Sequence, residues 1–544
     1  MMNIKLKDRR MSMKKLLVVL TMLIFVLSCG SKGGSSSTFT LNLSGEPASV
    51  DPQLSTDIIG GTVNDLISEG LLKRDKDGKI VGGLAEKWEV SEDGLKWTFH
   101  LRDGIKWSNG DPITANDFKV GWLRALDPNT ASQYSYMLYP IKNAEAFNNG
   151  KAKAEDLGIK VVDDKTIEVT LEAPTPYFDD LLTFKTYMPA NEKFLSEKGD
   201  KYFAEDAENV LSSGKYIMKE WVHDSEIKLE KNPNYYDAAN VKVDNIVLKL
   251  IADNAAAFNA FKNGEVDVTS ITIEQAKEFA GDDRLKSNND GSVWYMLFNF
   301  NNKVLANKNI RKALLMAVNR EEMTSKVLNG SGRPAKTFVP AGIGMKGLEK
   351  ADFTEEVPTT IPGFNPDEAK KLLAEGLKEL GLKEFPSLEL LFNDSGNNKV
   401  IAEYIQESLN KNLGINLNLA AVEFKERVSR MKSQQFDIVL AGWSGDFKDP
   451  ITYLDLFTTN GGNNNGKYSN PRYDELVKTI KSTGDQKVRY AAMVEIEAII
   501  ADDTPVGTLF HRERKYLINP KVQGLGLTAI GGEYNFSNLS IAKK

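Results

Sequence analysis

The stretch Phe436-Asp437-Ile438-Val439-Leu440-Ala441-Gly442-Trp443-Ser444-Gly445-Asp446 has the pattern of a buried strand that ends in a polar loop. Its first six residues are mostly apolar and carry β-branched side chains at their centre, which is typical of a strand covered on both faces. Gly442, Gly445 and the pair Asp449-Pro450 are strand-breaking residues. We therefore expect a strand over 436–441 and a loop directly after it.

The segments before this strand alternate between strand and helix patterns. They are a strand at 387–392, a helix at 400–409, a strand at 415–419 and a short helix at 424–431. This order favours a parallel sheet with right-handed crossovers. In open sheets of this kind, ligands bind outside the carboxyl ends of the strands. Trp443, Ser444 and Asp446 follow such an end, which makes them candidate ligand-binding residues.

The chain is longer than one hydrophobic core usually organises. It has 544 residues, so two or three subdomains are expected. A second strand, helix, strand unit is predicted over 247–268, and because it lies far from the first unit we expect two α/β lobes. Earlier in the chain, alternating strands at 97–101 and 105–107 flank the hairpin signal Asp103-Gly104 and predict a small α+β subdomain.

Composition excludes some classes of function. Hydrophobic residues make up 41% of the chain, which indicates a folded protein. The formal net charge is −6, with both signs mixed along the sequence. Because binding of phosphate groups needs concentrated Lys and Arg, a nucleic-acid partner is not expected.

The first thirty residues have the pattern of a secretory signal. Basic residues, including the pair Lys14-Lys15, precede the apolar run Leu16–Leu27, and small residues follow it. The run is too short for a comfortable membrane span. Because Lys14-Lys15 alone would supply the charged region, Met11 and Met13 are alternative start sites to Met1.

The only cysteine of the chain, Cys29, stands at the expected cleavage point after Val26-Leu27-Ser28. This arrangement resembles the lipobox of bacterial lipoproteins, in which the cysteine becomes the lipidated first residue. The resemblance implies a lipoprotein signal peptide at 1–28, then the lipidated Cys29 and a flexible tether over 29–37. A plain signal peptide with an incidental cysteine is the alternative. With no second cysteine, a large core and not a disulfide must stabilise the exported domain.

No pattern in the sequence favours a catalytic or metal site. The three histidines, His100, His223 and His511, fit neither a metal-ligand spacing nor a catalytic triad. Gly442–Asp446 misses the nucleophile elbow because its fifth residue is Asp and not Gly. Gly342–Gly347 matches G-x-G-x-x-G, yet it opens no helix and is interpreted as a loop. We therefore expect no enzyme activity, no metal and no cofactor.

Short motifs occur in a fixed order along nearly the whole mature chain. They are Glu86-Lys87-Trp88, Trp97–Arg102, Ile105–Gly110, Pro112–Phe118, Asp127–Ser132, Gly214-Lys215-Tyr216, Asn232–Tyr236, Gly264–Asp267, Asn309–Leu314 and Gly442–Asp446. Together they closely resemble the oligopeptide-binding lipoproteins of ABC importers, the peptide/nickel type of extracellular solute-binding protein family 5.

The resemblance implies an α/β fold of the two-lobed periplasmic-binding-protein type (type II, cluster C) with an additional inserted α+β subdomain. Members of the family close over their ligand by a hinge between the lobes. On this basis lobe I is expected at 38–58, 183–296 and 536–544, the inserted subdomain at 59–182, and lobe II at 297–535.

The resemblance also implies how a ligand is held. In the family, a peptide lies extended between protein strands, which satisfy its main-chain groups whatever its sequence. The matching segments here are Glu46–Ala48, with Pro47 at its centre, and Leu440–Ser444, with Gly442 at its centre. An aspartate matching Asp446 holds the free α-amino group, whose three donors suit a carboxylate. Leaving that charge unpaired in a closed cleft would cost about 3 to 5 kcal/mol, which selects for a free amino terminus.

The expected site also includes aromatic residues, and at one position this sequence differs from enteric members of the family. Trp294 and Tyr295 match aromatic residues at the hinge side of the family's pocket, and a buried strand is their alternative interpretation. Tyr534 aligns with a late tyrosine near the site, and Trp443 is expected either to line the cleft or to fill the core. Leu440 replaces an arginine of enteric members that is able to hold a short peptide's carboxylate. This predicts a more apolar pocket or a longer peptide.

The sequence thus predicts an extracytoplasmic, lipid-anchored substrate-binding component of an ABC peptide importer. The expected partners are an oligopeptide, the ABC permease subunits and, through the lipid, the membrane, and a monomer is expected. One alternative is the same fold with a non-peptide solute, such as an oligosaccharide, a nickel complex or haem. A surface lipoprotein for peptide sensing or adhesion and a hydrolase are the others.

Overall fold

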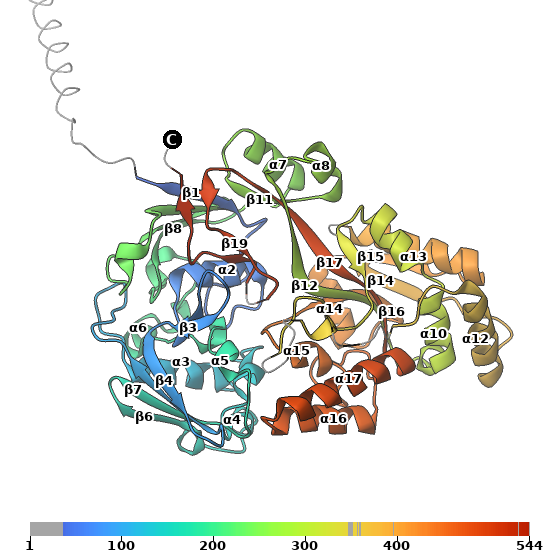
Figure 1. Cartoon of the computed structure of the whole chain (residues 1–544), viewed down its shortest axis with the longest axis horizontal. Helices are drawn as coiled ribbons and strands as arrows, with labels where there is room; N and C mark the ends of the chain where they lie inside the picture. The colour runs from blue at the N-terminus through green and yellow to red at the C-terminus, as the bar shows by residue number, and fades with distance from the viewer. Residues whose placement is uncertain are drawn as a thin grey trace, which may run out of the picture. The chain divides into compact units, whose positions relative to one another are not determined.

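The computed structural model describes residues 36–345, 352–355, 357, 361–394, 397–530 and 532–542 (Figure 1). Contacts group Thr38–Lys544 into one compact unit, separate from Met1–Ser37. The predicted signal peptide, Cys29 and most of the predicted tether therefore lie outside the described residues. Within the described ranges, every helix is too short or too polar to span a membrane.

One large sheet organises the described part of the compact unit. In sheet order its strands are β15 (Asn418–Val422), β14 (Glu389–Asn393), β16 (Ile438–Ser444), β12 (Leu285–Phe298), β17 (Val506–Ile518), β11 (Val268–Ile271), β1 (Thr38–Asn42), β10 (Asn245–Lys249), β9 (Glu226–Lys231) and β8 (Tyr216–Val222). β13 (Gly332–Pro334) pairs with β17 outside this path.

The smaller sheets lie mostly in the first third of the chain and at its end. They are β4 (Ala85–Val90), β5 (Lys96–Leu101), β7 (Thr166–Thr170) and β6 (Ile159–Asp163); β2 (Leu72–Arg74) with β3 (Ile80–Gly82); β18 (Val522–Gln523) with β21 (Ser540–Ile541); and β19 (Gly526–Leu527) with β20 (Tyr534–Asn535).

α-Helices pack on both faces of the large sheet, and others lie in the segment that contains the four-stranded sheet. They are α2 (Ile58–Ile67), α3 (Ala115–Leu126), α4 (Ala144–Asn148), α5 (Phe178–Leu181), α6 (Glu192–Lys198), α7 (Asn254–Lys262), α8 (Ile273–Glu278), α9 (Lys303–Ala306), α10 (Lys308–Met316), α11 (Arg320–Glu322), α12 (Pro366–Glu379), α13 (Asn398–Leu413), α14 (Phe424–Lys432), α15 (Ile451–Leu454), α16 (Pro471–Ser482) and α17 (Gln486–Asp503).

The two long strands β12 and β17 join the two halves of the large sheet. They run side by side and antiparallel, with β16 on the outer edge of β12 and β11 on the outer edge of β17 (Figure 1). Their pairing is interrupted between Asn289 and Val293, where the register shifts. Gly291 in this bulge has φ +64°, and a Cβ there would lie 2.4 Å from the carbonyl oxygen of Ala529. A glycine is therefore required at the bulge.

The predicted parallel unit before Asp446 is confirmed. β14 pairs in parallel with both β15 and β16, and α13 ends at Gly414, whose φ of +70° is left-handed. Two boundaries were wrong. β15 begins at Asn418 and not at Ile415, and β16 does not break at Gly442 but continues to Ser444, because β12 pairs with it as far as Ser292 opposite Ser444.

The predicted hairpin over 97–107 was also wrong. Residues 97–101 form β5, but the partners of β5 are β4 and β7. The segment 105–107 forms only an isolated bridge, Lys106 opposite Pro112. Ile105 and Trp107 are buried, so their alternation reflects packing of a loop against the core and not a strand. The second unit is confirmed, since β10 and β11 both pair in parallel with β1.

Alternating side chains of β12 and β16 enter two different hydrophobic clusters. Met296, Phe298 and Leu440 pack with helices α10, α12 and α13 on one face. Val293, Tyr295 and Ala441 pack on the other face, in the cluster that contains α15, α16 and α17. With both faces covered, only the edges of these strands remain for contact with another chain.

Candidate functional site

The second half of β16 has a partner strand on one edge only. β12 pairs with β16 from Ile438 to Ser444, whereas β14 pairs with the other edge only at Ile438 and Val439. Among the described residues, no strand pairs with that edge over Leu440–Ser444, which we call the open edge. Unpaired main-chain groups on a strand edge are able to bind an additional extended chain.

Little side-chain bulk stands along the open edge. Leu440 is 1% exposed and packs in the cluster with α10 and α13, and Ala441 is buried on the opposite face. Gly442 and Ser444 are exposed. Leu440 therefore does not present its side chain as part of a pocket wall, and a ligand at this edge would contact main chain.

The indole of Trp294 lies across Gly442. A Cβ at position 442 would stand 2.9 Å from Cε2 of Trp294, so a larger residue would displace the indole. The ring stacks on Phe510 with centroids 6.0 Å apart, and the guanidinium of Arg512 lies 5.4 Å from its centroid. Its Nε1–H is buried without a hydrogen-bond partner in the described part of the chain. Trp294 is thus held next to the open edge by stacking on Phe510, by the guanidinium of Arg512 and by packing against the hydrophobic cluster on that face.

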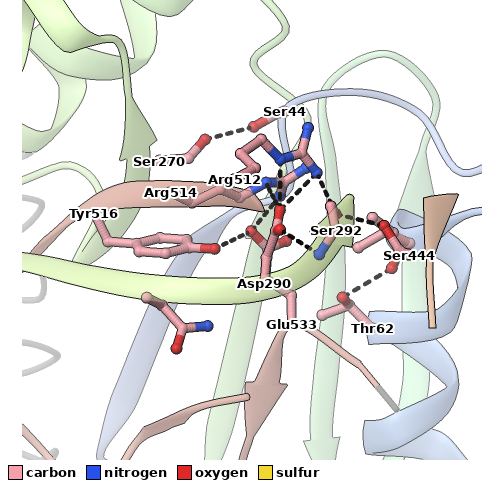
Figure 2. Close-up of polar contacts among 12 residues, drawn as sticks. Ser44, Thr62, Ser270, Asp290, Ser292, Ser444, Arg512, Arg514, Tyr516 and Glu533 are labelled. Carbon is pink, nitrogen blue, oxygen red and sulfur yellow. Dashed lines mark hydrogen bonds and ion pairs between the residues drawn. The ribbon is translucent and has the colours of Figure 1, made fainter. Parts of the chain in front are cut away.

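A network of charged and polar side chains lies at the bulge of β12 (Figure 2). Asp290 pairs with Arg512 at 2.6 Å and with Arg514 at 3.1 Å. Arg514 also pairs with Glu533 at 2.6 Å. These pairs are mostly buried, so each charge depends on its partner.

This network connects directly to the open edge. Arg512 donates to Oγ of Ser292 at 3.2 Å, and Ser292 Oγ lies 2.6 Å from Oγ of Ser444 (Figure 2). Ser444 is the last residue of β16, so its hydroxyl links the end of the open edge to the strands β12 and β17.

Asp446 lies two residues beyond the open edge and binds side chains from a distant part of the sequence. Its carboxylate accepts hydrogen bonds from the hydroxyls of Tyr134 at 3.0 Å and Tyr136 at 3.1 Å, and its backbone N–H donates to Oγ1 of Thr452. Burial raises the pKa of the Asp446 carboxyl to about 6, although both tyrosine hydroxyls and Lys185 lower it. A partly buried carboxylate with a raised pKa is stabilised by a cation placed beside it.

The cation already near Asp446 is Lys185. Its ammonium lies over the rings of Tyr134 and Phe184, at 5.5 and 5.1 Å, and its charge interacts with Asp57, Asp65 and Asp446. Burial lowers the pKa of Lys185. Its one hydrogen bond in the described residues is a long one, 3.4 Å to the carbonyl oxygen of Asp57. In the part of the chain that the structure describes, the Asp446 carboxylate therefore forms no direct ion pair.

Phe447 and Lys448, which follow Asp446, also contact the segment that contains Tyr134 and Tyr136. Phe447 stacks on Tyr177 with ring centroids 4.9 Å apart, and the N–H of Lys448 donates to Asp180 at 3.2 Å. The loop after β16 thus meets residues 134–180 through Asp446, Phe447 and Lys448.

Trp443 and Tyr295 pack on the core side of their strands. The indole of Trp443 donates to the carbonyl oxygen of Thr452 at 2.9 Å and packs against the core. Tyr295 is buried against Phe338, and burial raises the pKa of its phenol to about 12. Both side chains support the strands on the α15–α17 face.

The Glu46–Ala48 segment forms a loop after β1 and not a strand. The Glu46 carboxylate accepts from Nε1 of Trp221 and Nδ1 of His223, both at 2.8 Å, and from the N–H of Asp224 at 3.0 Å. Pro47 is buried and Ala48 is exposed. In the described part of the chain, no hydrogen bond joins this segment to the open edge.

Tyr534 is not brought to Asp446. It is buried and packs against Tyr516 and Phe536, in the cluster around β1 and β10. Cys29 lies outside the described residues. The described residues also contain no group of three or more His, Cys, Asp or Glu side chains able to hold a metal ion.

Comparison with known proteins identifies the family. The sequence profile of the bacterial extracellular solute-binding proteins, family 5 Middle, matches residues 79–465. The chain belongs to family 5 of these proteins. It is 36% identical to the oligopeptide-binding protein OppA of Bacillus subtilis (strain 168), over 96% of this chain and 98% of that protein. The structure of Listeria monocytogenes OppA bound to peptide gives a TM-score of 0.83 at 36% identity, covering 94% of this chain and 100% of that one.

Two structures of another family 5 protein differ in their similarity to this chain. The murein tripeptide binding protein MppA of Escherichia coli gives a TM-score of 0.81 at 28% identity, covering 94% of this chain and 99% of that one. The unliganded open form of MppA gives 0.70 at 27% identity, covering 94% and 98%. The structure is thus more similar to the first of these two MppA structures than to the unliganded open form.

These comparisons confirm the predicted family and fold class. The chain is a mixed α/β protein with a large sheet, similar to the two-lobed binding proteins of family 5. The sequence analysis missed Tyr134, Tyr136 and Lys185, which all lie near Asp446. The signal available was the aromatic density of 134–139, where Tyr134, Tyr136 and Tyr139 alternate with other residues.

Proposed function

We propose that this protein is the substrate-binding component of an ABC peptide importer. It binds oligopeptides in extended form along the open edge of β16, with the free α-amino group at Asp446, and presents them to the membrane permease. It has no catalytic cycle. Family membership and the 36% identity to OppA support the peptide assignment.

The observation that carries the proposal is the position of Asp446 at the end of an unpaired strand edge. Main-chain pairing along Leu440–Ser444 gives affinity without reading side chains. A carboxylate at the end of that edge fixes where an ammonium group must lie. On ligand binding, the ammonium takes the place of solvent beside Asp446 and adds to the two tyrosine hydroxyls.

We infer that the protein closes around its ligand by bending of the strands β12 and β17. We infer two lobes, with lobe I at 38–58, 183–296 and 536–544, an inserted subdomain at 59–182, and lobe II at 297–535. Because Tyr516 and Tyr534 pack in the cluster around β1 and β10, we place the return from lobe II to lobe I within β17. Since β12 and β17 pass from one half of the sheet to the other, the bulge at 290–292 is the proposed hinge. Ligand favours the closed form by its differential affinity for the two states.

The cellular setting follows from the amino terminus. We infer cleavage after residue 28, lipidation of Cys29 and a tether over 29–37, which together hold a monomeric binding protein at the outer side of the membrane. A single lipid chain gives marginal anchoring, so the modified cysteine is expected to carry more than one.

Calorimetric titration of the soluble chain beginning after Cys29 tests the peptide assignment. Tetra- and pentaalanine are expected to bind, whereas maltooligosaccharides, nickel chelates and haem are not. Hydrogen exchange in the same complex should slow at the amides of the open edge. If only a non-peptide solute binds, the proposal is wrong, and if peptides bind without protecting those amides, the site is elsewhere.

Peptide affinity is expected to fall below about pH 6. The raised pKa of Asp446, about 6, must drop when an ammonium group binds beside it. Below pH 6, binding therefore releases a proton, and affinity declines by up to about tenfold per pH unit. Between about pH 6 and 7.7 both groups are charged, and affinity is expected to be constant.

Titrations of one peptide between about pH 4.5 and 7.5 check this profile. Other titratable groups face the site, namely Tyr134, Tyr136, Lys185 and Asp455, and burial raises the pKa of nearby Asp65 to about 7. The Asp446→Asn variant therefore serves as the control, because it removes only the Asp446 step. A constant affinity down to about pH 4.5 in the unmodified protein would contradict the role of Asp446.

A further inference from the structure

Arg427 differs from the other buried arginines of the described residues. Arg311 donates four hydrogen bonds to backbone carbonyls, Arg320 does the same, and Arg489 pairs with Asp449. Arg427 is 9% exposed and has no carboxylate or carbonyl partner in the described part of the chain. It carries a charge that it cannot lose, because the guanidinium stays protonated in proteins.

The contacts that Arg427 does make are weak. Its Nη1 donates to the sulfur of Met431 at 3.0 Å, one turn further along α14, and the guanidinium lies 5.1 Å from the ring centroid of Phe424. A thioether is a poor acceptor for a cation. Nε is fully buried and has no partner. Among the described residues, the side formed by Nε and Nη2 therefore has no hydrogen-bond partner, and that side is the one that binds a carboxylate with two parallel hydrogen bonds.

The position of Arg427 relates it to the open edge. α14 connects β15 to β16 and packs over β14, on the same face as Tyr295. The positive charge of Arg427 lowers the pKa of the Tyr295 phenol, against the larger effect of burial. Tyr295 lies opposite Ala441 in the register of β12 and β16. Arg427 thus lies on the helix that packs over β14, and β14 is the strand that leaves β16 where the open edge begins.

We propose that Arg427 binds a carboxylate of the peptide ligand. This inference rests on the proposed function and adds a second charged contact to it, at the opposite end of the open edge from Asp446. The carboxylate comes either from the peptide's C-terminus or from an acidic side chain.

The spacing of the two contacts gives a peptide length. Ala441 and Asp446 are five positions apart, which is roughly 16 Å along an extended chain at about 3.3 Å per residue. A peptide with its amino group at Asp446 would bring its fifth residue or so to Arg427. We therefore expect peptides of about five residues to use both contacts, and dipeptides to use only one.

The test compares pentaalanine with a free C-terminus, amidated pentaalanine, and amidated pentapeptides with one Glu at the third, fourth or fifth position. Each is titrated into the soluble chain and into the variants Arg427→Met and Arg427→Lys. Arg430→Met is the matched control, since Arg430 lies on the same helix but already pairs with Glu389 and with the carbonyl oxygen of Gln435.

Arg427→Met is expected to weaken the carboxylate peptides about tenfold or more and the amidated pentaalanine less than about twofold. The affinity of Arg427→Lys for the carboxylate peptides should lie between those of the unmodified protein and Arg427→Met, because lysine keeps the charge but lacks the planar guanidinium. A loss confined to free C-termini or to Glu peptides identifies the source of the carboxylate. Arg427→Met should also raise the melting temperature of the ligand-free protein, because it removes an unpaired buried charge.

Two results would overturn the inference. One is unchanged affinity of Arg427→Met for every carboxylate peptide. The other is an equal loss for charged and amidated peptides together with a lower melting temperature, which would make Arg427 a structural residue. If the unmodified chain binds none of these peptides, the proposed function itself fails, and this outcome is distinct from both.

Discussion

Asp446→Asn is expected to weaken peptide binding about 100-fold, or by about 3 kcal/mol. The substitution keeps the size of the side chain and one of the two acceptor oxygens that Tyr134 and Tyr136 use, and the amide NH2 can donate to the other tyrosine's hydroxyl oxygen. It removes the charge that the α-amino group needs. Calorimetry with a peptide of about five residues measures the loss. Asp282→Asn is the matched control, because Asp282 pairs locally with Arg284, outside the contacts of Asp446.

The same substitution is expected to stabilise the ligand-free fold. The pKa of Asp446 is raised from 3.8 to about 6 by burial, so the ionised form is less favourable in the folded state than in the unfolded one. Above pH 6, Asn should therefore add about 1 to 2 kcal/mol to the free energy of unfolding, after allowance for partial exposure. The gain should disappear as the pH falls through 6 to about 4, where both states are protonated.

This pairing of effects separates a ligand-binding role from a structural one. If Asp446 were purely structural, its substitution would lower the free energy of unfolding, and peptide affinity would fall as a consequence. If Asp446 serves ligand binding, its substitution raises the free energy of unfolding and lowers peptide affinity. Urea unfolding at about pH 7.5 and at about pH 4, with calorimetry at the higher pH, distinguishes the two.

Arg489→Met is expected to destabilise the protein by about 3 to 5 kcal/mol. Arg489 is 0% exposed and its Nη2 lies 2.8 Å from Oδ1 of Asp449, which is itself buried. Burial already raises the pKa of Asp449, and removing the arginine leaves that carboxylate without its cation. Because Asp449 follows the loop that carries Asp446, peptide affinity should fall as well.

Two further variants check this explanation. Arg472→Met removes an exposed arginine that pairs with Glu475 and Glu495, and it should cost less than about 1 kcal/mol. Asp449→Asn combined with Arg489→Met should recover part of the loss, since no buried charge remains. A double variant as unstable as Arg489→Met alone would show that packing and not charge dominates.

The sequence was most informative where periodicity and caps coincide. The parallel arrangement of β14, β15 and β16 follows from apolar runs of the right length separated by helical patterns, and Gly414 marks a helix end. The end of β16 was misplaced because Gly442 has two interpretations. A glycine breaks a strand in isolation, but here it remains in the strand to accommodate the indole of Trp294.

The candidate site was predictable only in part. Asp446 was identified by its place after a strand and by resemblance to a family, and both are properties of local sequence. Tyr134 and Tyr136 were not identified, because they lie more than 300 positions away in sequence and only the fold brings them to Asp446. The same holds for Arg427, since a basic residue on a polar helix usually faces solvent and its burial is visible only in the structure.

The most direct test of the account is a titration of unmodified and Asp446→Asn protein with one pentapeptide before and after N-acetylation. Acetylation removes the charge of the amino group and leaves the rest of the peptide unchanged. The account predicts that acetylation weakens binding to the unmodified protein about 100-fold, or by about 3 kcal/mol, and has almost no further effect on the variant. Equal affinity of both peptides for the unmodified protein would contradict the claim that Asp446 holds the amino terminus.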